Sequence, residues 1–283
     1  MALLQTFEGK LPKTVFQKYL FLLSQLQDIP SYNFIPYKYG CFSFQSYEDK
    51  TTMAKQGFLS DGELLCRKDN VDYLSMLRDN DRRALITLKK LVGNLNIDEL
   101  IRYVYRTYPY YAINSEIKDK YLSEAELEKA TLSKPISNVP TLFTIGYEGK
   151  SIDVYLNQLI ENDIKILCDI RYNAVSRKYG FSKEQLNRCL SKLNYRYLHF
   201  PELGIEPTQR IVLNTQDDYD ALFRIYEKTI LPLHTESIDK IYRLVIDNKL
   251  VAITCFELNY FQCHRSVVAK VLSNRYGLEI RHI

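Results

Sequence analysis

From residue 141 to the end of the chain, short runs typical of buried β-strands alternate with longer runs that have helical spacing. The strand-like runs are TLFTIGY, IKILCDIR, YRYLHF, LVAITCFE and LEIRHI. The helical spacing falls between them, over residues 151–162, 182–193, 217–229, 236–247 and 266–276. Parallel strands need long crossovers, and helices in those crossovers cover the faces of the sheet. The pattern therefore predicts an α/β fold with a mainly parallel sheet that is covered by helices on its faces.

The first half of the chain has helical spacing interrupted by turn signals. Helices are predicted over residues 13–26 and about 43–56, and Asp61-Gly62 between apolar flanks predicts a tight hairpin. Helix, turn, helix and hairpin in this order are typical of a winged-helix unit that binds DNA, although the same order also serves protein contacts. Further helices are predicted over 73–92 and 97–107. We expect an α-rich, winged-helix-like domain.

The composition of the sequence changes over residues 118–140. This stretch, KDKYLSEAELEKATLSKPISNVP, is polar and charged and closes with two prolines. Such a composition indicates a helical spacer followed by a linker. The expected organisation is a helical domain over 1–117, a linker over 118–140 and an α/β domain over 141–283.

Composition excludes several classes of protein. No apolar run approaches the ~20 residues that span a bilayer, and the N-terminus lacks the pattern of a signal peptide, so we expect a cytoplasmic protein without a membrane role. The 6 cysteines form no CxxC pair, which favours reduced thiols. The net charge of +4 is shared evenly between the two halves and argues for no particular partner.

Tyrosine is abundant, with 23 residues, whereas tryptophan is absent. Several tyrosines cluster over residues 103–111. Tyrosine stacks on nucleic-acid bases, but it also packs in cores and interfaces with a hydrogen-bonding tip, and we favour packing here. A homodimer joined through these tyrosine-rich helices is one expectation.

Polar groups follow the predicted strands of the second half, at the edge where parallel sheets bind ligands. After the first strand, Gly146, Tyr147 and the turn up to Ser151 offer backbone amides that suit an anion. The turn has too few glycines for a dinucleotide fingerprint and is too short for a P-loop. An ordinary strand-to-helix turn is the alternative. His199 follows the third strand.

Asp169 and Arg171 stand two residues apart at the end of the second strand. Alternate residues of a strand point to the same face, so both are predicted to enter the crevice, with Arg177 close behind. Such a pair is either a structural salt bridge or an acid beside an anion clamp, because Arg fits phosphate and carboxylate groups.

The run CFELNYFQCHR, residues 255–265, lies between the fourth strand and the last helix. A thiol at a helix N-terminus beside His and Arg is expected to have a lowered pKa, which makes Cys263 a candidate nucleophile and Arg265 a candidate anion holder. Glu257 and His264 are candidate acid or base groups.

This run has three other interpretations. Zinc has possible ligands in Cys255, Cys263 and His264, but adjacent Cys and His do not easily reach one tetrahedral centre and no fourth ligand is evident, so we expect no metal and no cofactor. A phosphatase or rhodanese loop is disfavoured because the loop holds no glycine. Simple packing of Cys263 under the sheet stays open.

The second half resembles the family catalogued as domain of unknown function 488. The resemblance covers about residues 139–283 and rests on FTIGYEG, CDIRYNAVSRKYGFS, YRYLHFPELG and CFELNYFQCHR. Tyr172, Asn173 and Ala174 depart from the prolines and serines frequent after the D-x-R motif. The resemblance implies a Rossmann-like α/β domain of bacteria and archaea but supplies no reaction. The first half is similar to helical domains fused to such modules and to Panacea-type domains, through QKYLFLL, PYKYGCFSFQ and GFL.

These observations favour a prokaryotic enzyme that acts on a nucleotide or nucleic acid, as a glycohydrolase, transferase or nuclease-like protein in DNA modification or phage defence. In one version Glu257 attacks or activates water at a glycosidic carbon while Asp169 orients the sugar; in another Cys263 attacks. The alternatives are a non-catalytic nucleotide sensor or DNA-binding regulator, and a homodimeric scaffold.

Overall fold

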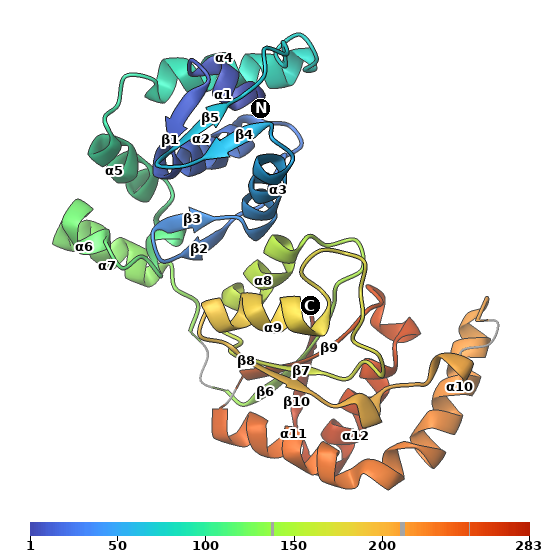
Figure 1. Ribbon diagram of the computed structural model, residues 1–283. Coiled ribbons are helices and arrows are strands. Elements are labelled where there is room, and N and C mark those ends of the chain that lie inside the picture. Colours follow the sequence, from blue (N-terminus) through green and yellow to red (C-terminus); the bar gives the residue numbers. More distant parts are fainter. Residues whose placement is uncertain (137–138, 210–212, 249) are drawn as a thin grey trace. The chain divides into compact units, whose positions relative to one another are not determined.

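The computed structural model describes residues 1–136, 139–209, 213–248 and 250–283, and it divides into two compact units, Met1–Lys134 and Pro135–Ile283 (Figure 1). The expected linker over 118–140 holds two helices, α6 and α7. Tyr121, Leu122 and Ala130 are buried in the core of the first unit, so the division falls after α7. Residues 137 and 138 of that stretch lie outside the described residues.

The first unit is built mainly of helices around a small antiparallel sheet. Its longer helices are α2 (Lys13–Leu26), α3 (Phe44–Lys55), α4 (Asp79–Val92) and α5 (Ile97–Thr107), with the shorter α1 (Ala2–Thr6), α6 (Lys118–Tyr121) and α7 (Glu124–Leu132). Strands β1 (Lys10–Pro12), β4 (Leu59–Asp61) and β5 (Leu64–Arg67) form a sheet in the order β1-β5-β4, and β2 (Ile35–Tyr37) pairs with β3 (Gly40–Phe42). The predicted helices over 13–26 and 43–56 and the hairpin at residues 61–62 are confirmed.

Local side-chain bonds explain where several of these helices begin. The hydroxyl of Ser43 accepts the amide of Ser46 at the start of α3, and Asn96 and Glu99 form a capping box at the start of α5. The helix predicted over 73–92 begins later, at Asp79. The amides of Tyr73 and Leu74 donate instead to the side chain of Gln5, at 2.8 and 3.3 Å.

The tyrosines over residues 103–111 pack largely within the first unit. Tyr105 is fully buried and its hydroxyl hydrogen-bonds the hydroxyl of Ser115 at 2.7 Å. Tyr108 and Tyr111 both make edge contacts with the ring of Phe21. Packing therefore accounts for this cluster, and the homodimer stays a prediction.

The second unit is a mixed α/β structure with a parallel sheet of five strands in the order β10-β6-β9-β7-β8. The strands are β6 (Thr141–Gly146), β7 (Ile166–Asp169), β8 (Arg196–His199), β9 (Leu250–Cys255) and β10 (Glu279–His282), and the helices are α8 (Ile152–Glu161), α9 (Lys183–Lys192), α10 (Gln216–Thr229), α11 (Thr235–Asn248) and α12 (His264–Tyr276). Helices α8 and α9 cover one face and α11 and α12 the other (Figure 1). The predicted alternation of strands and helices is confirmed.

Strand β9 lies at the centre of the sheet, between β6 and β7, although it comes fourth along the chain. Every residue of β6 and β9 is buried, as expected for central strands covered on both faces.

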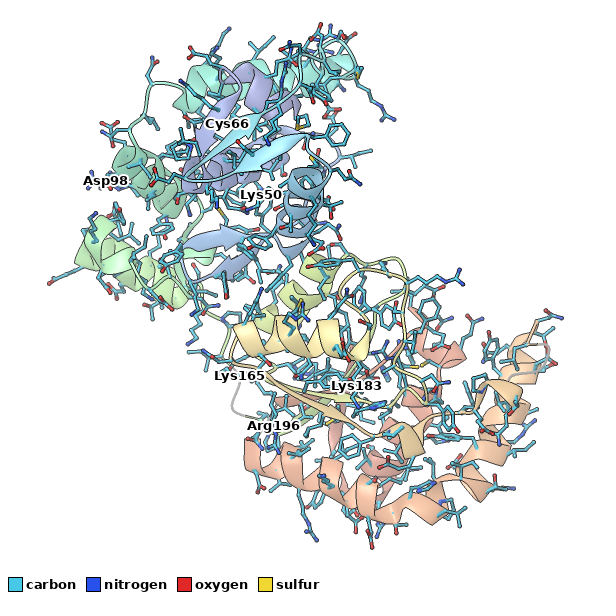
Figure 2. All side chains as sticks on the ribbon, in the orientation of Figure 1. Lys50, Cys66, Asp98, Lys165, Lys183 and Arg196 are labelled. Atoms are coloured by element: carbon cyan, nitrogen blue, oxygen red, sulfur yellow. The ribbon has the colours of Figure 1, made fainter. Side chains whose placement is uncertain are left out.

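Charged residues such as Asp98, Lys183 and Arg196 are exposed on the two units (Figure 2). Among the described residues, no helix is both long and apolar enough to span a membrane.

Candidate active site

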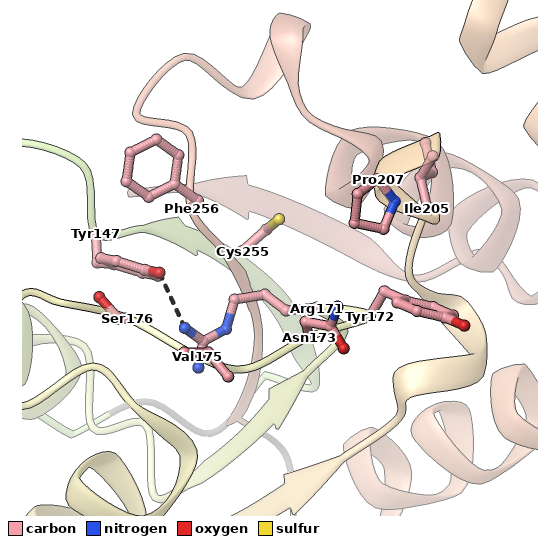
Figure 3. A pocket seen from close by; sticks show the side chains of 10 residues that line it. All are labelled: Tyr147, Arg171, Tyr172, Asn173, Val175, Ser176, Ile205, Pro207, Cys255 and Phe256. Atoms are coloured by element: carbon pink, nitrogen blue, oxygen red, sulfur yellow. Dashed lines mark hydrogen bonds between the residues drawn. The ribbon is translucent and has the colours of Figure 1, made fainter. Parts of the chain in front are cut away.

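The carboxyl ends of β6, β7 and β9 meet beside one cavity of the second unit. Parallel pairing places Gly146 opposite Cys255 and Asp169 opposite Thr254, so these strand ends lie level. The cavity has a volume of about 390 Å³, and Figure 3 shows the side chains that line it. It is lined by Tyr147, Arg171, Tyr172, Asn173, Val175, Ser176, Ile205, Pro207, Cys255 and Phe256.

Asp169 and Arg171 form a buried ion pair at the end of β7. Oδ1 of Asp169 accepts Nε of Arg171 at 2.8 Å, Oδ2 accepts Nη2 at 2.5 Å, and the hydroxyl of Tyr197 donates to Oδ2 at 2.6 Å. Nη1 of Arg171 donates to the hydroxyl of Tyr147 and to the carbonyl of Phe181. Asp169 is fully buried, whereas Arg171 lines the cavity. The pair has the geometry of the salt-bridge alternative.

Two thiols and an imidazole converge behind the end of β9. The ligand atoms of Cys255, Cys263 and His264 lie within 4.8 Å of one another, and all three residues are buried. Sγ of Cys255 lies 3.7 Å from Nδ1 of His264. Nε2 of His264 lies 3.1 Å from the carbonyl oxygen of Ile170, which only accepts, so Nε2 carries a proton. Cys255 also lines the cavity.

The electrostatics of the two thiols differ from the prediction. Burial raises the pKa of Cys255, but hydrogen bonding by Cys263 and the charge of His264 outweigh it and lower the pKa below the ordinary value. Burial and the hydrogen bond to Cys255 raise the pKa of the Cys263 thiol well above its ordinary value. The lowered pKa expected for Cys263 at the helix start is therefore wrong, because Cys263 is fully desolvated and faces a second sulfur.

Glu257 lies beside the thiols and Arg265 beneath the loop that carries them. Oε2 of Glu257 accepts a hydrogen bond from Sγ of Cys255 at 3.3 Å. Nη1 and Nη2 of Arg265 donate to the backbone carbonyls of Glu257 and Leu258. Arg265 is almost completely buried and does not line the cavity. Its guanidinium holds the loop between β9 and α12 instead of facing the cavity where an anion would bind.

In the turn after β6, backbone amides bind a backbone carbonyl and are not free to hold an anion. The amides of Tyr147 and Glu148 both donate to the carbonyl of Phe256, at 3.1 and 2.9 Å. The expectation that free amides of this turn hold an anion is thus wrong for these two. A Cβ on Gly146 would lie 1.9 Å from the carbonyl oxygen of Glu257, so glycine is required where the β9–α12 loop approaches.

Comparison with known protein families identifies this unit. Residues 151–272 match the family model described as Domain of unknown function DUF488. These residues belong to the DUF488 family. The match spans α8 to most of α12 and includes the Asp169–Arg171 pair and the cluster of Cys255, Cys263 and His264. No curated protein and no solved structure matches the chain.

The other predicted residues of the DUF488 unit occupy different places. Nε2 of His199 lies 2.8 Å from the carbonyl oxygen of Arg171, so the ring supports the segment that lines the cavity. Arg177 is exposed and is not among the lining residues. Tyr147 lines the cavity with its ring stacked on Phe181, at a centroid distance of 4.3 Å.

Several lining residues of the DUF488 unit were missed by sequence reasoning. Phe256 directly follows the buried strand that ends at Cys255, a position that could have assigned it to the cavity. Tyr172 and Asn173 directly follow Arg171, which is a similar signal. Ile205 and Pro207 come from a loop after β8, and nothing in their local sequence indicates that they face the same cavity.

Proposed function

We propose that the DUF488 unit is an enzyme that hydrolyses or transfers part of a nucleotide or nucleic-acid substrate bound in the cavity at the strand ends. The observation that carries this proposal is the position of Cys255. Its side chain lines the cavity and at the same time contacts Glu257 and His264. A thiol that faces the cavity is thus backed by a carboxylate and an imidazole, which is a grouping that catalytic sites use.

The lining of the cavity suits a nucleotide. A volume of about 390 Å³ lies in the range of small-molecule sites. Tyr172 and Phe256, which are both exposed, supply aromatic rings on which a base can stack, and Asn173 and Ser176 supply polar groups beside them. A position at the carboxyl ends of parallel strands is the ligand site of Rossmann-like folds, and we assign the unit to that class.

In this proposal the first unit binds and recognises DNA. The order is α1, β1, α2, β2, β3, α3, β4, β5, with the sheet order β1-β5-β4. Apart from the inserted hairpin β2–β3, this is the order expected of a winged-helix domain. We assign DNA as its partner and place the protein in the prokaryotic cytoplasm, in DNA modification or phage defence. If this assignment holds, duplex DNA binds the full chain with an affinity that falls as salt rises. Binding that does not depend on salt would contradict it.

Turnover on a panel of nucleosides, nucleotides, NAD-like compounds and oligonucleotides tests the enzymatic role. Cys255→Ser and Glu257→Gln are each expected to lower turnover at least 100-fold, while Cys189→Ser, which changes another buried thiol, on α9, leaves it unchanged. Melting temperatures of all three variants check the fold. Turnover that survives both site variants would contradict the proposal.

A non-catalytic nucleotide sensor is the second candidate. It is favoured by one observation, the mutual neutralisation of Asp169 and Arg171, which leaves the charged groups nearest the cavity engaged with each other. If the unit is a sensor, we expect a nucleotide to raise the melting temperature of the full chain. We also expect that no compound of the substrate panel is converted.

A further inference from the structure

We propose that Cys255, Cys263 and His264 bind a soft divalent cation of the zinc class at the wall of the cavity. A tetrahedral zinc ion with Zn–S of about 2.3 Å and Zn–N of about 2.0 Å places its sulfur and nitrogen ligands about 3.5 Å apart. The observed separation of Cys255 Sγ and His264 Nδ1 is 3.7 Å, and all three ligand atoms lie within 4.8 Å of one another. The spacing therefore needs little adjustment to hold an ion.

In the sequence, the adjacency of Cys263 and His264 argued against a zinc site. The local backbone conformation removes this objection. Cys263 is extended, with φ −131° and ψ 132°, and His264 is the first residue of α12. The change from extended to helical backbone occurs between the two residues. Both side chains consequently turn inward and are 1% exposed.

The imidazole of His264 is oriented as a metal ligand. Because Nε2 donates to the carbonyl of Ile170, Nδ1, the atom nearer Cys255, is the nitrogen that would bind a metal after giving up any proton it carries. Histidine ligands of metal sites commonly donate their second N–H to a backbone carbonyl in this way, which fixes the ring. Two thiols and one imidazole are soft donors that favour zinc over magnesium or calcium.

Glu257 is placed to act beside the ion. Its Oε2 contacts Cys255 but does not share the mutual spacing of the three ligand atoms. A site with three protein ligands keeps a fourth position for water, and zinc enzymes that act on nucleobases combine a His/Cys/Cys set with a glutamate that is not a ligand. The spacing Cys255-x-Glu257, followed by Cys263-His264, places the same groups together.

The catalytic use of the ion rests on the proposed function, whereas metal binding itself does not. In that use, the bound water gives a proton to Glu257 and its oxygen forms a bond to an electrophilic carbon of the substrate. The bond from that carbon to the leaving nitrogen or oxygen breaks, and Glu257 returns the proton to the leaving atom. The sum is hydrolysis, and no oxidant or reductant is needed.

The test titrates the reduced, chelator-treated full chain with Zn²⁺ and with Co²⁺. We expect equimolar binding and, for Co²⁺, thiolate charge-transfer absorption together with the strong visible bands of a tetrahedral ion, all displaced by Zn²⁺. Cys255→Ser, Cys263→Ser and His264→Asn are each expected to weaken Zn²⁺ binding at least about tenfold. The matched control Cys189→Ser is expected to bind like the parent protein. Because the cobalt spectrum of the parent protein reports thiolate ligands directly, the test does not depend on the folding of any variant.

Two results would overturn the site: a parent protein that gives no thiolate–cobalt absorption, or one in which Cys255 and Cys263 form a disulfide that persists in reductant. The role of Glu257 is tested separately with Glu257→Gln. If Glu257→Gln binds the metal but no longer turns over substrate, the catalytic use of the ion is supported. If Glu257→Gln keeps its turnover, that use is overturned. Turnover that needs Cys255 in a protein without bound metal would leave the proposed function standing and remove this inference alone.

Discussion

The carboxylate of Asp169 binds the guanidinium of Arg171, two residues further along the chain, and both groups are buried. The pair stands at the end of β7, where Arg171 forms part of the cavity wall. Because each charge is removed from water, each depends on the other. The pair therefore links the stability of the second unit to the shape of the proposed site.

Asp169→Asn should destabilise the protein by about 3–5 kcal/mol, because it leaves the buried Arg171 charge without its partner. The double variant Asp169→Asn with Arg171→Met is expected to recover part of this loss. Urea unfolding of the single and double variants measures the coupling.

The pair Glu279 and Arg281 provides a matched control. It has the same two-residue spacing on β10, with a distance of 2.7 Å, but both side chains are largely exposed. Glu279→Gln is expected to cost less than about 1 kcal/mol, since solvent screens exposed pairs. Equal losses for Asp169→Asn and Glu279→Gln would contradict the role of burial.

Gly146→Ala should destabilise the second unit by about 1–3 kcal/mol, the usual cost of overpacking. The new Cβ would lie 1.9 Å from the carbonyl oxygen of Glu257, which is backbone and cannot rotate away. Thermal unfolding measures the loss. Gly62→Ala is the control, since a Cβ there meets nothing within 4 Å, and a similar loss for both variants would argue against the contact.

Lys150→Met should stabilise the protein below pH 8. Burial and the charge of Arg265 lower the pKa of Lys150 from 10.5 to about 8. Below pH 8 the lysine is protonated in both states, so the folded protein bears the full cost of the charge. Between pH 8 and 10.5 the folded state loses a proton that the unfolded chain keeps, so the stability of the parent protein rises with pH.

The stabilisation by Lys150→Met is expected to be about 1 kcal/mol or less, because Lys150 is only partly buried, and to vanish towards pH 10.5. Melting temperatures measured from pH 6 to pH 10 check this dependence. The exposed residue Lys270 serves as the control through Lys270→Met. A gain that is constant with pH would show that removal of the charge is not its cause.

Tyr105→Phe should lower the stability of the first unit by about 0.5–1.5 kcal/mol, because it removes a buried hydrogen bond to Ser115. Tyr39→Phe changes an exposed ring and is expected to stay within about 0.5 kcal/mol of the parent protein. Chemical denaturation compares the two. A neutral Tyr105→Phe variant would mean that ring packing alone accounts for this tyrosine.

Much of the fold could be predicted because its signals are local. Alternating apolar residues indicated the strands of the second unit, and helical spacing indicated the helices between them. The start of α4 could not be predicted, because Gln5, far away in the sequence, binds the amides of Tyr73 and Leu74. Such a contact leaves no trace in the periodicity of residues 73–78.

The candidate site was predicted less completely than the fold. That Asp169 and Arg171 point the same way follows from the two-residue period of a strand, but their mutual engagement depends on burial by Tyr197, Tyr147 and Phe181. Likewise, the position of Cys263 at the start of a helix was evident. Its raised pKa was not, because it arises from desolvation and from Cys255.

By itself, the sequence determined the order of strands and helices and the residues that stand at the strand ends, since both follow from backbone period and side-chain polarity. Only the tertiary structure decided that β9 inserts between β6 and β7, which sets Cys255 opposite Gly146 at the wall of the cavity. The folded loop after β9 decided that Cys255 contacts His264 and that Arg265 donates to backbone carbonyls. The physical reason is that proximity and desolvation are properties of packed neighbours. Residues distant in the chain supply those neighbours, and no local pattern records them.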